Sequence, residues 1–546
     1  MAYQTSPGIS VTEVDVTTVV PAVSSSVGGI AGVFAWGPIL TPVLVTSEVD
    51  LVRRFGKPIK NFNVETFFTA ADFLAYSNSL YVVRANTGAA AAPLAGSDGA
   101  IAGFKAKYPG KYGDALKVQV LSSTTYAEAD ANTYSLLKGP SRVVSKAPLE
   151  NRVHIIVIDS TGQFTGVENS VLEVYENVST VDGAKKANGA NNNWIDVINA
   201  TSNYITVEES DVVAQVNMIQ GTAISFTMQD GSNGSNENNI SLGLIQSAYD
   251  KFANPEEIDV SLIMQGTAST ISTGSRAAYI ANICESRMDA IAFASPPKAT
   301  VISESNLPNS DATADIINWV TSVTSSVGDT RVQSYLVLDS GYKYRYDRYN
   351  DTYIYTPLNG DIAGLCARTD ELRDPWFSPA GYNRGGIKNI IKLAYNPTKA
   401  DRDELYQASV NPVITQPGQG TVLFGDKTAV QAESAFDRIN VRRLFIVLEK
   451  AITRASRSTL FEFNDEFTRA QFRNLIEPFL RDIQGRRGIY DYKVVCDETN
   501  NTPEIIDRNE FVGDIYIKPA RAINFIRLNF VAVRTGVEFE EIIGQR

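Results

Sequence analysis

Histidine is almost absent from this chain of 546 residues, which contains His154 alone. A single histidine rules out HExxH metal sites and leaves at most one position for a histidine general base. His154 follows Val153 at the start of the run VHIIVI, and such a run predicts a β-strand. We therefore interpret His154 as a strand residue, and most histidine-dependent chemistry is excluded.

Cysteine is also scarce, and the three cysteines lie far apart at Cys284, Cys366 and Cys496. An odd number without CxxC spacing favours reduced, buried thiols over a disulfide framework. We expect no metal site and no cofactor.

Long apolar runs are missing, so no segment is expected to insert into a membrane. The first residues, MAYQTSPGIS, lack both the basic and the apolar regions of a secretory signal. We therefore expect the protein to remain in the cytoplasm where it is made.

Catalytic signatures are absent as well: the sequence has no GxSxG, and the loops of its α/β region have no GxGxxG. From Gly420 the chain reads GxxxxGDKT, one residue too many for a phosphate-binding loop, with an apolar strand pattern inside it. An NTPase is excluded. A catalytic carboxylate pair stays open, and with it an α/β-fold enzyme without a recognisable motif.

The net charge of −12 argues against general nucleic-acid binding, which needs a basic footprint. Residues 438–487 reverse the sign, with eleven Lys or Arg against six Asp or Glu, or 11 − 6 = +5. Two amphipathic helical patterns carry this charge. In the first, an apolar face of Val441, Leu444, Phe445, Leu448 and Ile452 lies apart from a basic stripe of Arg443, Lys450, Arg454 and Arg457.

The second helical pattern contains Pro478, which should bend it, and has Arg469, Arg473 and Arg481 outside its apolar face. Two interpretations of the basic residues stay open. They are either ordinary solvated helix faces or a surface for a long acidic partner.

Residues 1–22 predict an N-terminal arm and linker, because the strand pattern Thr5–Val20 has no partner at hairpin distance. Its central residues are Ile9, Val11, Glu13 and Val14. A disordered tail is the alternative. Residues 522–546 predict a C-terminal arm in which Phe525 lies on one strand face and Ile526, Leu528 and Phe530 on the other. Since both faces are substantially apolar, this strand should be covered on both sides.

Between the arms, strands alternating with helices over residues 23–87 and 240–396 predict a middle domain with a parallel sheet. Residues 88–239 are rich in strands and turns and predict a β-rich insertion, which ends at the flexible-looking DGSNGSNENN. Residues 397–521 predict an α+β core domain. The fold class is therefore multidomain, α/β and α+β, with extended β arms at both ends.

Six tyrosines lie within residues 341–360, interleaved with Lys and Arg. They could stack on single-stranded nucleic acid. The alternation of Tyr342, Tyr344 and Tyr346 instead favours a twisted hairpin with one aromatic face.

Several segments carry a family resemblance: SPGISVTEVD, GVFAWGPILTPVLVTSEVDLVRRFG, PLNGDIAGLCARTD, PWFSPAGYNRGGIKN, FGDKTA, FDRINVRRLF and VVCDETNNTPEIIDRNEFV. With them the chain closely resembles the tail sheath proteins of contractile-tailed bacteriophages. The resemblance covers residues 5–88 and about 258 to the C-terminus.

The resemblance implies a subunit that polymerises in hexameric layers around a rigid tail tube and contracts when a baseplate triggers it. It implies a virion protein assembled in the host cytoplasm, with the tail tube, baseplate and tail terminator proteins as partners and no direct contact with nucleic acid. It further implies that residues 88–239 face outward, that the basic helices face the tube, and that the arms add strands to neighbouring subunits. A tail-fibre or adhesin module is the other alternative, although no internal repeat supports it.

Overall fold

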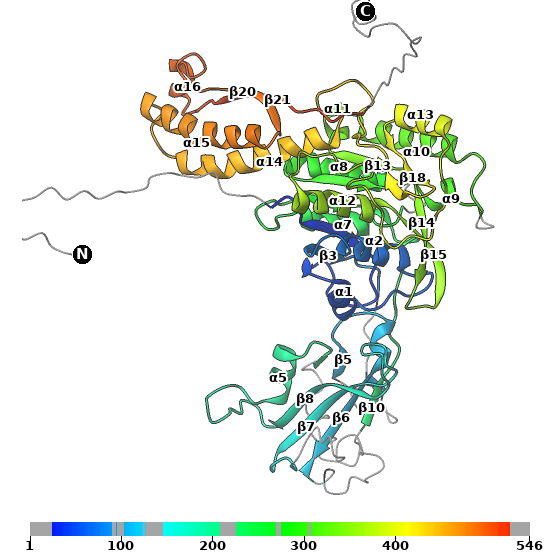
Figure 1. The fold of residues 1–546 in the computed structure, drawn as a ribbon. Helices are drawn as coiled ribbons and strands as arrows, with labels where there is room; N and C mark the ends of the chain where they lie inside the picture. Colours follow the sequence, from blue (N-terminus) through cyan, green and yellow to red (C-terminus); the bar gives the residue numbers. More distant parts are fainter. Residues whose placement is uncertain are drawn as a thin grey trace, which may run out of the picture.

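The computed structural model describes residues 24–89, 94–95, 103–123, 126, 146–207, 225–268, 275–303 and 307–524. Three parts follow one another in space: a β-rich part, a central α/β part, and a pair of long helices with a β-hairpin (Figure 1). None of the helices described combines the length and the apolar character that crossing a membrane requires.

The central part is built on a seven-stranded sheet, in which only the edge strand β2 runs antiparallel to its neighbour. The order is β17-β13-β12-β11-β1-β3-β2. The strands are β1 (Gly28–Gly32), β2 (Val43–Val45), β3 (Leu80–Arg84), β11 (Leu262–Met264), β12 (Ile291–Ala294), β13 (Leu336–Asp339) and β17 (Val410–Asn411). The predicted parallel sheet is confirmed.

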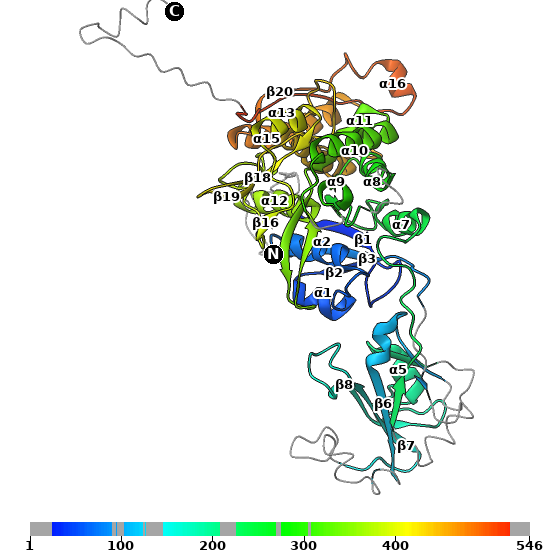
Figure 2. The same cartoon turned by 90° about the vertical axis from the view of Figure 1, so that its right-hand side faces the viewer.

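Helices cover this sheet on both faces (Figure 2). They are α1 (Glu48–Phe55), α2 (Val64–Leu74), α7 (Leu242–Tyr249), α8 (Ser275–Arg287), α9 (Lys298–Val301), α10 (Ala312–Val327), α11 (Thr330–Gln333), α12 (Asn359–Leu372) and α13 (Lys399–Gln407). α12 approaches α2 closely because of two glycines one turn apart. A Cβ on Gly360 would lie 2.4 Å from the Thr69 carbonyl oxygen, and one on Gly364 2.4 Å from the Tyr76 ring.

The tyrosine-rich segment forms a hairpin, as predicted, with β14 (Tyr342–Asp347) paired to β15 (Thr352–Pro357) and to β16 (Lys392–Leu393). Successive side chains of β14 point to opposite faces of the hairpin, and the two faces have different surroundings. Tyr346 opposes Tyr353 on the outer face, whereas Lys343 is buried between Asp72 (3.0 Å) and Asp361 (2.8 Å). Lys343 is thus engaged inside the protein, where it cannot meet a phosphate backbone. Gly420 begins strand β19 (Gly420–Leu423), which pairs with β18 (Val413–Gln416), so the near-miss loop is a hairpin.

The β-rich part has its own core around a five-stranded antiparallel sheet, β4-β10-β6-β7-β8. Its elements are β4 (Leu94–Ala95), β5 (Phe104–Ala106), a 3₁₀ turn (Lys111–Ala115), β6 (Leu116–Ser122), β7 (Arg152–Asp159), β8 (Ser170–Ser179), α5 (Trp194–Thr201), β9 (Ile205–Val207) and β10 (Ser225–Met228). His154 is buried in β7, where its Nδ1 accepts a hydrogen bond from the Asn177 amide at 3.0 Å. Its interpretation as a strand residue is confirmed.

The junction between the β-rich and central parts is ordered, contrary to the flexible end expected at 230–239. The Ser235 backbone amide donates to the Thr87 carbonyl at 2.9 Å, so the two segments that connect the β-rich and central parts lie side by side. The buried Glu237 carboxylate accepts from the Glu65 and Thr66 amides at 3.0 and 2.8 Å. Both amides belong to the first turn of α2, whose N-terminus has unsatisfied donors, so Glu237 caps a helix of the central part.

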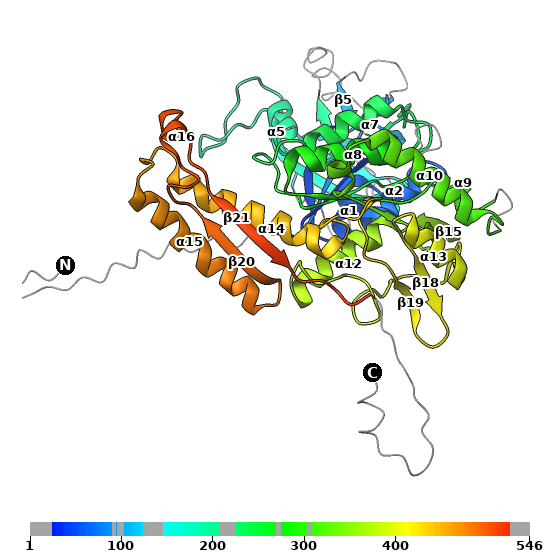
Figure 3. The same ribbon diagram turned by 90° about the horizontal axis from the view of Figure 1, so that it is seen from above.

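The C-terminal part is an α+β layer of two antiparallel helices and a two-stranded sheet (Figure 3). It contains α14 (Ile439–Ser456), a 3₁₀ turn (Arg457–Thr459), α15 (Glu466–Gly485), β20 (Ile489–Val495), α16 (Pro503–Asp507) and β21 (Asp514–Pro519). Its core joins Leu444 and Leu448 to Ile476 and Leu480. The central core meanwhile reaches as far as Ile446, so residues 397–438 pack with the central sheet rather than with the part predicted to begin at 397.

We expect residues 89–233 to be replaceable by three glycines, because Thr87 and Ser235 are already hydrogen-bonded neighbours. Trp36→Gln should accompany the excision, since Trp36 loses its edge-on contacts with Tyr108 and Phe164. The shortened protein should be soluble and unfold cooperatively by circular dichroism.

The matched control removes residues 88–239 and with them Glu237. Loss of a helix cap costs about 1–2 kcal/mol, so the wider deletion should melt several degrees below the narrower one. Equal melting temperatures would contradict the capping role of Glu237.

Candidate functional site

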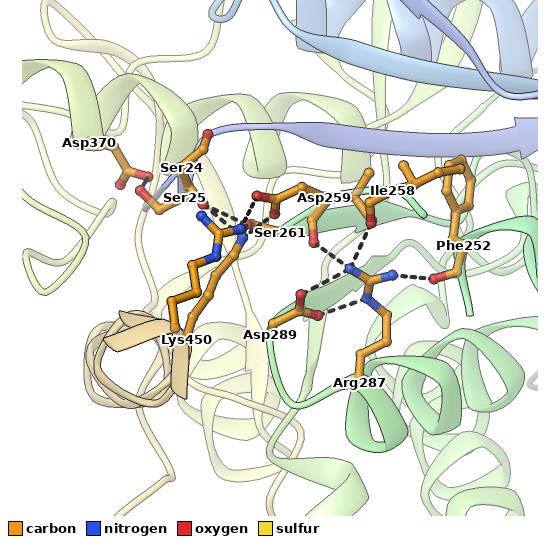
Figure 4. Close-up of polar contacts among 12 residues, drawn as sticks. Ser24, Ser25, Phe252, Ile258, Asp259, Ser261, Arg287, Asp289, Asp370 and Lys450 are labelled. Atoms are coloured by element: carbon orange, nitrogen blue, oxygen red, sulfur yellow. Dashed lines mark hydrogen bonds and ion pairs between the residues drawn. The ribbon is translucent and has the colours of Figure 1, made fainter. Parts of the chain in front are cut away.

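Part of the basic stripe of α14 points into the protein, where it meets carboxylates of the central part (Figure 4). The buried Arg443 guanidinium donates to both Asp370 carboxylate oxygens, at 2.8 and 2.6 Å, and to the Cys366 carbonyl at 3.3 Å. Asp370 lies near the end of α12. One end of α14 is thereby fixed to a helix that covers the central sheet.

Lys450 makes the second contact, two turns further along α14. Its ammonium is paired with Asp259 and donates to the Ser261 hydroxyl at 3.2 Å, and Arg454 contacts the other Asp259 oxygen at 2.5 Å. The loop that holds Asp259 is itself fixed by Arg287, which pairs with Asp289 at 2.7 Å and donates to the carbonyls of Phe252 and Ile258. The acceptor for Lys450 is therefore held in place.

The first described residues of the chain run between these two contacts. Lys450 donates to the Ser24 carbonyl at 3.0 Å, and the Ser25 hydroxyl donates to Asp370 at 2.6 Å. We call this group the arm-root joint: Ser24, Ser25, Asp259, Asp370, Arg443 and Lys450. It brings together the base of the N-terminal arm, the central sheet and α14.

Electrostatics strengthens one half of the joint more than the other. Burial alone would raise the pKa of Asp259, but hydrogen bonds and charges from Lys450 and Arg454 outweigh it and hold that pKa below its usual value. Burial raises the pKa of Asp370 despite the opposing charge of Arg443. Protonation of Asp259 thus needs a pH below the ordinary aspartate range, so its contribution is present at neutral pH and is lost only in acid.

The expected surface position of the α14 stripe is wrong for Arg443 and Lys450. Both are buried, with 3% and 8% of their surface exposed, because Asp370 and Asp259 compensate their charges inside the chain. Arg454 is half-buried, and Arg457 is exposed with Glu256 at 4.0 Å.

In the second helix, α15, the burial of the predicted basic residues also differs from one residue to the next. Arg469 is buried and donates to the Asn464 side chain at 3.0 Å, Arg473 is half-buried, and Arg481 is exposed. Of the predicted basic residues, Arg481 and Arg457 present their charges most openly to solvent.

A cleft of about 1110 Å³ lies beside the joint, between α14 and the central part. Its lining combines apolar side chains of α14 and β21, such as Leu448, Ile452 and Ile515, with charged groups of the loop around Asp259. α14 therefore touches the central part through separate contacts with space between them.

The hairpin β20–β21 stands alone as a two-stranded sheet among the described residues. Isolated hairpins are marginal in water, and each of these strands has an outer edge without a described neighbour. One face packs on α15, whereas Tyr490 and Tyr516 are exposed on the other. The sheet has the form of a template for further strands.

The predicted arm strands lie outside the described residues; this holds for Ile9, Val11, Glu13 and Val14 and for Phe525, Ile526, Leu528 and Phe530. The described chain reaches the base of the C-terminal arm. There, the Asn524 amide donates to Asp426 and to the Tyr406 hydroxyl, each at 2.9 Å.

The carboxyl edge of the central sheet, where α/β enzymes bind ligands, is occupied by side chains that satisfy one another. The side-chain amide of Asn359 donates to the Gly266 carbonyl at 2.9 Å and to the Ser295 hydroxyl at 3.0 Å. The Ser295 hydroxyl in turn donates to the Asp339 carboxylate at 2.6 Å. Burial raises the pKa of Asp339 to about 8. Within the described ranges, His, Cys, Asp and Glu form no group suited to a metal ion, and all three cysteines are buried and free.

Sequence reasoning missed the acidic half of the joint. Asp259 belongs to no motif, and Asp370 ends the segment PLNGDIAGLCARTD, which gives it no role as an ion-pair partner. Their partners are 191 and 73 residues away. The adjacent pair Arg442-Arg443 offered a signal, because it interrupts an otherwise apolar helix start. Arg442 is buried too, between the rings of Tyr335 and Phe436.

Comparison with known proteins places these features in a family. Residues 26–85 match the "Tail sheath protein Gp18 domain III N-terminal region", residues 245–429 the "Phage tail sheath protein central domain", and residues 431–532 the "Phage tail sheath C-terminal domain". The chain is 33% identical to the tail sheath protein of Enterobacteria phage T4 and 32% identical to that of Vibrio phage KVP40, over 99% of each chain.

Solved structures share the fold at much lower identity. The sheath tail protein of Desulfitobacterium hafniense aligns with a TM-score of 0.54 at 10% identity, over 95% of this chain and 99% of its own. The Listeria innocua sheath tail protein aligns with a TM-score of 0.53 at 11% identity, over 91% and 96%.

Arg443→Met should destabilise the folded protein by roughly 3 kcal/mol, because it leaves the buried Asp370 without its cation. Arg457→Met is the matched control on the same helix. Since Arg457 is exposed and its partner is distant, that change should stay within about 0.5 kcal/mol. Urea unfolding followed by circular dichroism measures both, and equal losses would contradict the structural role of the joint.

Proposed function

Because the chain belongs to the phage tail sheath protein family and is the structural subunit of a contractile sheath, we propose that it polymerises as a helical stack of six-subunit layers around an inner tail tube. Contraction of this stack drives the tube through the host envelope. The observation that carries the mode of assembly is the hairpin β20–β21, which pairs with no third strand among the described residues and so offers two strand edges on a chain with two predicted arms.

The arms supply the strands that the hairpin lacks. In this arrangement the arms of neighbouring subunits pair with β20 and β21, and main-chain hydrogen bonds link the subunits. Such bonds do not depend on particular side chains, so they hold while linkers at each arm base rotate. A link of this kind keeps the polymer closed during contraction.

For this proposal we keep the predicted domain arrangement, with two adjustments. Residues 23–87 with 240–396 form the middle domain, extended by 397–438, and residues 88–239 form an outer insertion whose last residues, from Ser235, belong to the middle domain by contact. The C-terminal domain then carries the assembly surface at the inside of the sheath. The arrangement leaves the β-rich insertion at the opposite end of the molecule from α15 (Figure 1).

The candidates for the tube contact are the predicted basic side chains that form no buried ion pair inside the chain. Arg481 and Arg473 of α15 are the remaining candidates, together with the exposed Arg457. Charge contacts at a surface are individually weak and screened by salt, yet they multiply over every subunit. The polymer ends meet baseplate and tail terminator proteins, and assembly takes place in the host cytoplasm. No catalytic step is part of this proposal.

Deleting Met1–Val20, or truncating the chain after Ala522, should abolish polymerisation while leaving the fold intact. The described core begins at Ser24 and its secondary structure ends at Pro519, so neither deletion removes a helix or strand of the described core. Sedimentation with negative-stain microscopy measures assembly, and circular dichroism checks the fold. Hollow tubes formed by both truncated proteins would rule out strand exchange, whereas the intact protein should form them.

Arg481→Glu should weaken the binding of the sheath to purified tail tubes of the same phage. Co-sedimentation with tubes over a salt series should show release at lower salt than for the unaltered protein. Lys450→Glu is the contrasting change, because it should act through lost folding stability and not through the salt profile. An unchanged salt profile for Arg481→Glu would exclude this residue from the tube contact.

A further inference from the structure

The turn between α14 and α15, together with the first two residues of α15, forms an acidic, aromatic projection. Its residues 460–467 read LFEFNDEF, with four large apolar residues, three acids and no Lys or Arg. Phe461, Phe463 and Phe467 expose 106%, 84% and 75% of their surface. We call residues 460–467 the tip. Exposed apolar groups gathered in this way mark interaction sites on soluble proteins.

The tip is held in one conformation by polar contacts. The Asn464 amide donates to the Glu510 carbonyl at 2.9 Å, and Asp465 caps α15 by accepting from the Thr468 amide at 2.8 Å. The two other acids, Glu462 and Glu466, form no ion pair within the described part of the chain. Their charges are therefore available to a partner.

A groove with the opposite character lies where α15 ends. It encloses about 1180 Å³ between the central and C-terminal parts, and aromatic side chains such as Trp376, Phe377, Phe424 and Tyr490 line it. Five basic residues border it, Arg384, Lys399, Arg402, Arg487 and Arg521, against two acids, Asp403 and Asp426. Asp426 is already paired with Arg438 at 3.1 Å. Arg402 and Arg487 have no carboxylate within ion-pair distance among the residues described.

One subunit cannot place its tip in its own groove. The two surfaces lie at opposite ends of α15, whose 20 residues extend roughly 30 Å at 1.5 Å per residue. Figure 3 shows the same separation: the tip end, near α16, points away from the central part, and the other end of α15 meets it. Complementary patches at two different places on one molecule generate head-to-tail contacts, which build rings or helical polymers.

We propose that the tip of one subunit seats in the groove of a second copy, with its phenylalanines against the aromatic lining and Glu462 and Glu466 against Arg402 and Arg487. The inference rests on the proposed function, because it supplies a side-chain contact for the same polymer. It adds a contact between particular side chains to the strand exchange, whose main-chain hydrogen bonds depend little on which side chains are present. Charge complementarity selects a second copy, since the acids and the basic residues are uncompensated on the same chain.

Engineered cysteines test the contact directly, because the native cysteines are all buried. A tagged full-length subunit with Phe463→Cys is mixed with an untagged one carrying Tyr490→Cys and polymerised with oxidised glutathione. The mixed covalent dimer should form. The control partner carries Tyr516→Cys, which is equally exposed on the adjacent strand but does not line the groove, and should give at least tenfold less dimer.

A charge exchange provides the second measurement. Glu462→Lys with Glu466→Lys, or Arg402→Glu with Arg487→Glu, should each raise the critical concentration for polymerisation at least tenfold. The chain that carries all four changes should recover, and circular dichroism excludes misfolding.

Four results would overturn the inference. Normal polymers that form without the mixed dimer overturn it and leave the proposed function intact. The same holds if the fourfold variant has a critical concentration no lower than that of the twofold variants. Cross-linking of Phe463→Cys to the tube protein in place of the second copy assigns the tip to the tube. Failure of the unaltered protein to polymerise overturns the proposed function as well.

Discussion

Burial of two cations on one helix is the constraint on which the arrangement of this protein depends. A buried charge is costly unless a partner of opposite sign accompanies it, so Arg443 and Lys450 can lie inside only where Asp370 and Asp259 meet them. Asp370 comes from α12 and Asp259 from the loop before β11. Since the backbone of Ser24 and the hydroxyl of Ser25 share these contacts, the base of the N-terminal arm is fixed to the same place. One group of ion pairs therefore sets how α14, the central sheet and the arm meet.

This arrangement suits a subunit that must move without coming apart. The arm base is tied to the body by side chains with defined partners, whereas the predicted link between subunits uses main-chain hydrogen bonds that tolerate rotation. A pull on an arm would be transmitted to Asp370 and α14 rather than absorbed by a loose terminus. In the polymer that we propose, the subunit rotates as a rigid body while its connections persist, which is the kind of domain movement that bistable assemblies use.

The central sheet illustrates how little a fold says about function. Its parallel strands and covering helices match the architecture of many α/β enzymes, and the carboxyl edge is where such enzymes bind ligands. Here Asn359, Ser295 and Asp339 bond to one another at that edge. Likewise, Lys343 lies in the tyrosine hairpin, for which nucleic-acid stacking was one interpretation, but it forms buried ion pairs with Asp72 and Asp361. The polar groups of this scaffold hold elements together.

The sequence by itself determined which residues share a strand or a helix face. Periodicity placed the parallel sheet, the tyrosine hairpin and both amphipathic helices, because a period of 2 or 3.6 is a local property of the chain. It also pointed to the family, through segments spread over most of the length. Tertiary structure alone decided what each face meets. Arg443 and Arg481 look alike in sequence, yet one is buried against Asp370 and the other is exposed. Glu237 lay in a stretch that reads as flexible, but it caps α2, and the central core extended past residue 397. In each case the deciding partner lies scores of residues away along the chain, so no local pattern contains it.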